Sequence, residues 1–459
     1  MERAVLVRDR AVLAVVVTTA FLTMLDNTVV TVAAPSIARD LGTPLPTLEW
    51  VATGYMLAFA GLMLPGGRLA DRYGHRRTLL TGLALFTTAS LAAGAAGSAG
   101  TLIAARIAQG TGAALLIPAT LAVVAAGGER ARLRGTAAWT ASGAAALAAG
   151  PVLGGAVSQH LHWSWIFLLN VPVGLAALAT AWYTLDEGRD PGAARLDLAG
   201  MCTSTVALAA ATYALTSGTA HGWATPAVLG SAAVAAVAAA TFLAVERRAR
   251  TPMVDPGLFA VRAFRGGVAV QVLWGLGVNG VFFYTAIYLQ DVRGYPPTLA
   301  GLAFLATAGA VACGAPFAPR LVHRLGAART VALGLGLVAA GMGVVAAGSA
   351  HVVVLLAALT VIGFGSALTV PLAAVVLAAA APQHAGVAAG VFGVAREVSG
   401  VLGIAGIGVV VAGGPGIARG YVIGLAAAAV LVAGGALIGA RTLPGLSADP
   451  ADAVSAGRH

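Results

Sequence analysis

The sequence contains no lysine, and all 27 of its basic residues are arginines. Without lysine, the chain has no phosphate-binding loop of the Walker type, no Schiff-base lysine and no lysine general base. We therefore do not expect direct ATP hydrolysis by this chain.

Charge and cysteine are also scarce. Charged residues make up 10% of the 459 residues, too few to cover the surface of a soluble fold of this length. The two cysteines, Cys202 and Cys313, do not form a metal-binding spacing, and no two histidines are four residues apart. We expect no metal site, and we expect both cysteines to be small apolar core residues.

Long apolar stretches are abundant. Hydrophobic residues make up 59% of the chain and the mean hydropathy is +0.90, against roughly 45–50% apolar residues in soluble domains. Stretches of about 18–24 apolar residues recur, and each can cross a hydrocarbon core of ~30 Å. The sequence therefore predicts an all-α polytopic membrane protein with fourteen transmembrane helices: 11–34, 49–66, 78–97, 101–124, 136–158, 164–184, 198–217, 226–245, 267–290, 299–318, 329–347, 351–373, 386–412 and 420–440.

The arginines indicate an orientation. With the N-terminus in the cytoplasm, 22 of them fall on the cytoplasmic side, 3 on the outer side and 2, Arg106 and Arg396, within predicted spans. This skew is what the positive-inside rule predicts. We expect a multi-pass protein of the cell (inner, cytoplasmic) membrane with both termini cytoplasmic. This explains the isoelectric point of about 10.5 without a nucleic-acid partner.

One charged stretch recurs. Residues 68–77 read RLADRYGHRR and residues 320–329 read RLVHRLGAAR, with His323 in place of Asp71. Parallel repeats of this kind are typical of secondary transporters. They predict an N-terminal six-helix bundle (1–185), two extra transmembrane helices with linkers (186–266), a C-terminal six-helix bundle (267–440) and a cytoplasmic tail (441–459).

Five stretches, one of which contains the first copy of the repeat, resemble the motifs of a known family. They are LDNTVVTVAAP (25–35), GRLADRYGHRR (67–77), RIAQGTGAA (106–114), GPVLGG (150–155) and WIFLLNVPVG (165–174). In this order they resemble the drug:proton antiporters of the major facilitator superfamily, of the fourteen-helix type. The resemblance implies two six-helix bundles plus two inserted helices and efflux of drugs or antibiotics.

Buried charges are the candidates for proton coupling. A carboxylate at membrane depth costs roughly 2.5–3.5 kcal/mol on insertion scales, so Asp26 is expected to be functional. Burial favours its protonated form and a nearby cation its ionised form, which suits a proton carrier. The resemblance assigns Arg106 to the same relay. Arg396 and Glu397 lie mid-span, about 100° apart around their helix, so we expect no bridge between them. Either Asp26 or Glu397 is the main carrier; static ion pairs or polar clamps between helices are the structural alternatives.

The remaining candidates fall into three sets. The joint between helices 2 and 3 is predicted to be a gating loop formed by Gly67, Asp71, Arg72, Gly74, Arg76 and Arg77, with Gly67 and Gly74 allowing a tight turn.

The resemblance makes Gly150, Pro151, Gly154 and Gly155 an antiporter motif that prevents leak; ordinary small-residue packing is the alternative. Aromatic and amide groups suit a pocket for amphipathic ligands, with Tyr55, Gln109, Trp139, Gln271, Asn279 and Phe283 as candidates and Phe282 and Tyr284 nearby.

These features predict a secondary active transporter rather than an enzyme. It exports amphipathic drugs or antibiotics in exchange for protons, needs no cofactor beyond the proton gradient, and is expected to be monomeric in the bilayer. An uptake symporter or facilitator of a small organic solute, or a dedicated exporter of one endogenous metabolite, are alternatives on the same fold. A membrane sensor that transports nothing would leave the buried charges without a role.

Overall fold

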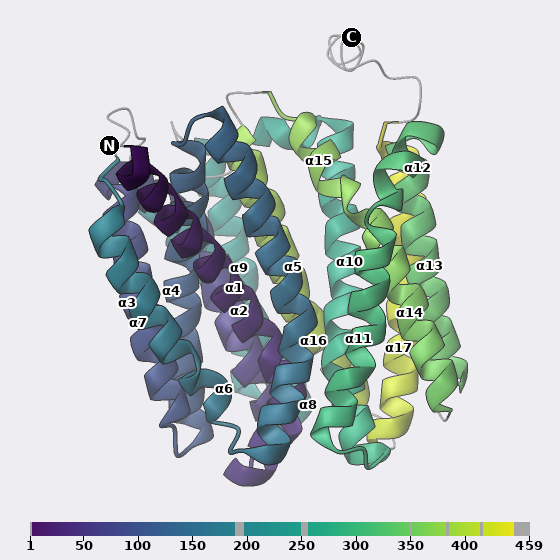
Figure 1. Cartoon of the computed structure of the whole chain (residues 1–459). Coiled ribbons are helices and arrows are strands. Elements are labelled where there is room, and N and C mark those ends of the chain that lie inside the picture. The colour runs from purple at the N-terminus through teal and green to yellow at the C-terminus, as the bar shows by residue number, and fades with distance from the viewer. Residues whose placement is uncertain are drawn as a thin grey trace. The chain divides into compact units, whose positions relative to one another are not determined.

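The computed structural model describes residues 2–188, 197–248, 256–348, 351–381, 385–413 and 416–444 (Figure 1). Every regular element in these ranges is helical. The predicted cytoplasmic tail lies outside the described residues from position 445 onward, as does the middle of the predicted linker, 189–196.

The helices follow one another with short connections. The first half contains α1 (Glu2–Leu41), α2 (Leu45–Tyr73), α3 (His75–Gly94), α4 (Ala99–Ala125), α5 (Glu129–His160), α6 (Trp165–Leu168) and α7 (Asn170–Thr184). Then come α8 (Leu198–His221), α9 (Pro226–Arg248) and the short helix η1 (Pro256–Ala260). The remainder contains α10 (Arg262–Ile287), η2 (Tyr288–Val292), α11 (Pro297–Gly314), α12 (Phe317–Leu325), α13 (Ala327–Gly348), α14 (Val352–Thr369), α15 (Pro371–Ala378), α16 (Ala385–Gly413) and α17 (Ile417–Thr442).

Thirteen helical segments within the described residues are long and apolar enough to cross a membrane. They match thirteen of the fourteen predicted spans. The remaining prediction, 78–97, corresponds to α3, a helix of 20 residues whose first turn contains His75, Arg76 and Arg77. These polar residues keep α3 outside the set of thirteen, so the count of fourteen stays a prediction.

The chain divides into two compact units, which are described separately. The first contains residues 1–211, 232–242 and 294–301, and in it α2 packs on α4, α1 on α5, and α3 on α4 and α7. Glycine permits the closest approach: a side-chain carbon at Gly110 of α4 would overlap the carbonyl oxygen of Tyr55 on α2. Small residues at helix contacts are the usual device for close packing inside a membrane.

The second unit contains residues 212–231, 243–293 and 302–459. Its described helices pack with α13 on α14 and α17, and α10 on α16 and α17. Gly280 and Gly403 bring α10 and α16 together, since a carbon at Gly280 would lie 2.5 Å from the Gly403 oxygen.

The expectation that the cysteines are core residues is wrong. Cys202 on α8 and Cys313 on α11 are both exposed. Because the surroundings of a membrane span are apolar lipid, a small apolar side chain gains nothing by turning inward there.

The two copies of the repeated charged stretch have the same local geometry, each within its own unit. Gly74 separates α2 from α3 with φ 104°, and Gly326 separates α12 from α13 with φ 81°. Four residues later, Thr78 and Thr330 each donate a side-chain hydrogen bond to the carbonyl oxygen of that glycine, at 2.9 and 2.8 Å. Positive φ favours glycine, which explains why glycine stands at this position in both copies.

Candidate functional site

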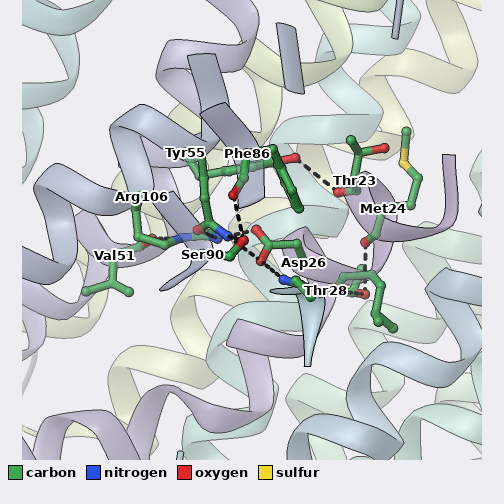
Figure 2. Close-up of polar contacts among 12 residues, drawn as sticks. Thr23, Met24, Asp26, Thr28, Val51, Tyr55, Phe86, Ser90 and Arg106 are labelled. Atoms are coloured by element: carbon green, nitrogen blue, oxygen red, sulfur yellow. Dashed lines mark hydrogen bonds and ion pairs between the residues drawn. The ribbon is translucent and has the colours of Figure 1, made fainter. Parts of the chain in front are cut away.

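A buried ion pair joins α1 to α4 inside the first unit. The Nη1 atom of Arg106 bonds to Oδ2 of Asp26, and both side chains are 0% exposed (Figure 2). Breaking a buried pair by removing one partner costs about 3–5 kcal/mol, because the other charge is left uncompensated.

Two amides complete the shell of donors around Asp26. Gln109 and Asn170 donate their Nε2 and Nδ2 groups to Oδ1 of Asp26, each at 3.0 Å. The same Nε2 lies 2.8 Å from the hydroxyl oxygen of Ser90, and the Gln109 Oε1 accepts from Arg106 Nη1 at 2.9 Å. The arginine thus determines which way the glutamine amide points. The carboxylate thus accepts hydrogen bonds from three donors.

The guanidinium of Arg106 is held from a third helix. Its Nε donates to the carbonyl oxygen of Val51 at 3.0 Å, and its Cζ lies 4.4 Å above the centre of the Tyr55 ring (Figure 2). Val51 and Tyr55 are four residues apart on α2, so they occupy one face of that helix. The Tyr55 hydroxyl in turn donates to Thr23 O on α1 at 3.1 Å. Desolvated cation–π contacts of this kind contribute about 2 kcal/mol.

Local sequence explains how these groups come to face one another. Ser98 forms a capping box with Thr101 at the start of α4, which sets where that helix begins. Arg106 and Gln109 then lie three residues apart on one face. Asn170 is the first residue of α7, after the short helix α6.

This network connects five helices. Asp26 on α1 is bonded to α4 and α7, and the α4 side chains are bonded in turn to α2 and α3. The Nη2 group of Arg106 has no hydrogen-bond partner among the described residues.

Asn170 and Ser90 belong to this site, although they were not among the predicted site residues. Both are buried, at 2% and 0% exposure. An asparagine in the otherwise apolar stretch WIFLLNVPVG was a usable signal, since an amide in a membrane span requires a partner. Nothing in the sequence distinguished Ser90 from other small residues of α3.

The prediction that Arg396 and Glu397 do not bridge is wrong. In α16 of the second unit, Nε and Nη2 of Arg396 lie 3.1 and 2.9 Å from Oε1 of Glu397. The two side chains do leave the helix in different directions, but the arginine side chain is long enough to reach the glutamate. Glu397 is nearly fully buried, whereas the Arg396 side chain is 42% exposed.

The predicted pocket residues divide between the units. In the first unit, Tyr55 and Gln109 belong to the ion-pair site, and Trp139 on α5 is half-buried. The other three residues lie on α10 of the second unit. There Gln271 is buried with an Nε2 that has no described partner, Asn279 donates to Gly275 O at 3.0 Å, and the Phe283 ring meets Tyr284 at 5.3 Å.

The predicted gating loop is not a loop. Helix α2 continues through Asp71 and Arg72 to Tyr73, and α3 begins at His75, so only Gly74 interrupts the helices. The glycine at 67 therefore lies within α2 and takes no part in the turn. Glycine is tolerated within a helix at a cost of about 1 kcal/mol relative to alanine.

Arginines of this joint hold the chain that follows α7. Arg76 donates to the Trp182 carbonyl oxygen at 2.7 Å, and its Cζ lies 5.0 Å from the Trp182 ring centre. Arg77 pairs with Glu187 at 3.3 Å, and His75 N donates to Gly188 O at 3.0 Å. The end of α7 is thereby attached to the start of α3.

The GPVLGG glycines are buried in α5. Side-chain carbons at Gly150 and Gly154 would overlap Thr28 and Val29 of α1, so both positions permit close contact with the helix that carries Asp26. A carbon at Gly155 would overlap the Pro297 oxygen, in the segment 294–301 of the same unit. Pro151 is also buried within the helix.

Comparison with known sequences identifies the class of protein. The sequence model of the Major Facilitator Superfamily matches residues 16–404, most of the chain. The chain therefore belongs to the Major Facilitator Superfamily of membrane transporters, as the motifs predicted. Small molecules are the substrates to expect in this family.

Named relatives and solved structures agree with this assignment. The chain is 36% identical to the puromycin resistance protein pur8 of Streptomyces alboniger, covering 86% of this chain and 80% of that protein. It is 37% identical to the cephamycin export protein CmcT of Amycolatopsis lactamdurans, covering 84% and 81%. A crystal structure of a peptide transporter POT in complex with sulfate superposes with a TM-score of 0.68 at 16% identity, covering 94% and 93%. This last likeness shows the fold alone.

Proposed function

We propose that this transporter exports amphipathic drugs or antibiotics in exchange for protons, by alternating access. The buried pair of Asp26 and Arg106 is the observation that carries the proposal, because a charge kept in the membrane interior needs a role. Export as the direction is supported by the relatives, which are named as resistance and export proteins.

Asp26 is the proton carrier in this proposal. In the ionised state it ties α1 to α4 and α7 through Arg106, Gln109 and Asn170. Proton binding weakens this tie and lets the helices move, and proton release restores it. Glu397 remains a second candidate carrier, since it is buried and its described partner is the half-exposed Arg396.

The proton gradient is the energy source in this proposal. One charge crossing ~100 mV supplies about 2.3 kcal/mol, enough for roughly a fifty-fold solute gradient. No other cofactor is required. The proposal also includes fourteen spans, with α3 as the third, both termini in the cytoplasm, and a monomer in the cell membrane.

Everted vesicles test the exchange. A preset acid-inside gradient is monitored with a pH-sensitive dye while an amphipathic cationic, neutral or anionic compound is added. We expect at least one compound to release protons as it accumulates. Asp26→Asn is expected to abolish the release, whereas Glu129→Gln, an exposed acid in the first turn of α5, is expected to retain it.

Each other outcome points to a different function. Accumulation without proton movement would leave an exporter but remove the antiport. Movement of solute and protons in the same direction would indicate an uptake symporter. Release by one compound of a broad panel would favour a dedicated exporter, which the name of the cephamycin export protein also supports.

A further inference from the structure

The second copy of the charged stretch has no acidic partner among the residues that the structure describes. In the first copy, Arg77 pairs with Glu187 from the chain that follows α7. The corresponding chain after α17 also docks on its joint, since Ala328 N donates to Pro444 O at 3.2 Å. Its described residues there, Leu443 and Pro444, carry no charge.

The substitution of His323 for Asp71 removes a further acid. Arg320, His323 and Arg324 are all exposed on α12. Within the described ranges of the chain, none of these three side chains takes part in an ion pair. Among the described residues, the second copy therefore presents basic groups without a carboxylate like Glu187, which pairs with Arg77 in the first.

These basic groups surround one pocket. Pro319, Arg320, His323 and Arg324 line a surface hollow of about 330 Å³. The hollow is wide open on one side and has room for a phosphate group. Arginine is well suited to phosphate, because its guanidinium donates two parallel hydrogen bonds.

Helix α12 is expected at a membrane surface. It connects two candidate membrane spans, Pro297–Gly314 and Ala327–Ala347. Phe317 and Leu325, at its two ends, are exposed apolar side chains, and the Arg320 Cζ lies 5.8 Å from the Phe317 ring centre. Basic residues beside exposed apolar ones match a ligand with a charged headgroup and acyl chains.

We propose that α12 binds the phosphate of an anionic phospholipid in this pocket. The first copy of the stretch is a joint within the chain, where Arg76 and Arg77 have partners at the end of α7 and just after it, and the second is a lipid site. Lipid binding here does not require that the transporter exchanges protons.

The test is a binding titration on the purified full chain in neutral detergent. The probes are dihexanoyl phosphatidylglycerol, dihexanoyl phosphatidylcholine and inorganic phosphate. We expect phosphatidylglycerol to bind more tightly than either of the others. Replacing both arginines (R320Q/R324Q) is expected to weaken its binding roughly 30-fold, the factor that corresponds to about 1 kcal/mol for each of two arginines.

Matched variants separate the site from general charge. R76Q/R77Q removes the same charge from the first copy and is expected to change the affinity less than about threefold, as those arginines already have partners. His323→Asp restores the acid of the first copy and is expected to weaken binding about tenfold, whereas His323→Asn is expected to weaken it less.

Three results would overturn the proposal: equal losses in the two double variants, equal affinity for the two lipids, or free phosphate that binds as tightly as phosphatidylglycerol. The last would identify a site for a soluble anion. If R320Q/R324Q does not elute as a single species in gel filtration, the comparison of His323→Asp with His323→Asn decides.

Discussion

The Nδ2 atom of Asn170 lies 3.0 Å from Oδ1 of Asp26, although the two residues are 144 positions apart in the sequence. Gln109 donates to the same oxygen from a third helix. The carboxylate is thus held by neutral amides on one oxygen and by Arg106 on the other.

Replacing Asn170 with leucine is expected to destabilise the protein and to slow export. The carboxylate of Asp26 loses one of its three donors, and hydrogen bonds to charged groups contribute about 1.5–3 kcal/mol. Thermal unfolding in detergent and initial rates of dye export in vesicles measure the two effects.

Asn279→Leu is the matched control for Asn170→Leu. It removes the same amide from α10, where Asn279 bonds only to Gly275 O among its described side-chain contacts. Its thermal stability is expected to fall less than that of Asn170→Leu, even if its apparent substrate affinity changes. Equal losses of stability in the two variants would show that the bond from Asn170 to Asp26 contributes nothing.

Removing one charge of the buried pair is expected to destabilise the protein more than removing both. Asp26→Leu leaves Arg106 buried without its carboxylate, at a cost of about 3–5 kcal/mol, and Arg106→Leu does the converse. The double replacement removes both charges and is expected to recover part of that loss. Thermal unfolding in detergent compares the three variants; additive single effects would contradict the pairing.

Substituting alanine at Gly110 is expected to destabilise the first unit by about 1–3 kcal/mol. The added carbon would overlap the Tyr55 carbonyl oxygen, and α2 and α4 would have to separate. The control is Gly100→Ala on the same helix, where nothing lies within 4 Å of an added carbon. That variant is expected to be neutral or slightly stabilising in the same thermal assay.

Asp71→Asn is expected to slow transport without reducing the yield of folded protein. Asp71 lies half-buried in the last turns of α2, next to the joint whose arginines bind the end of α7. Initial rates of dye export, compared with Glu129→Gln, measure the effect. Equal rates in the two variants would mean that the stretch is a topological anchor and no gate.

The sequence by itself determined that this is a helical membrane protein and in which superfamily it belongs. Membrane spans depend on the length and apolarity of contiguous residues, and each motif is a local pattern, so both can be identified along the chain. For the same reason Asp26 and Arg106 stood out, because a charge inside an apolar run is conspicuous.

The tertiary structure alone decided which groups meet. The donors to Asp26 come from α4 and α7, and Ser90 joins them from α3, a combination that depends on how helices pack around one another. Rotamers decided the contact between Arg396 and Glu397, which backbone angles alone did not predict. Docking of the end of α7 onto α3 gave Arg76 and Arg77 their partners, whereas Arg320 and Arg324 on α12 form no ion pair among the described residues, because equivalent backbones carry different side chains.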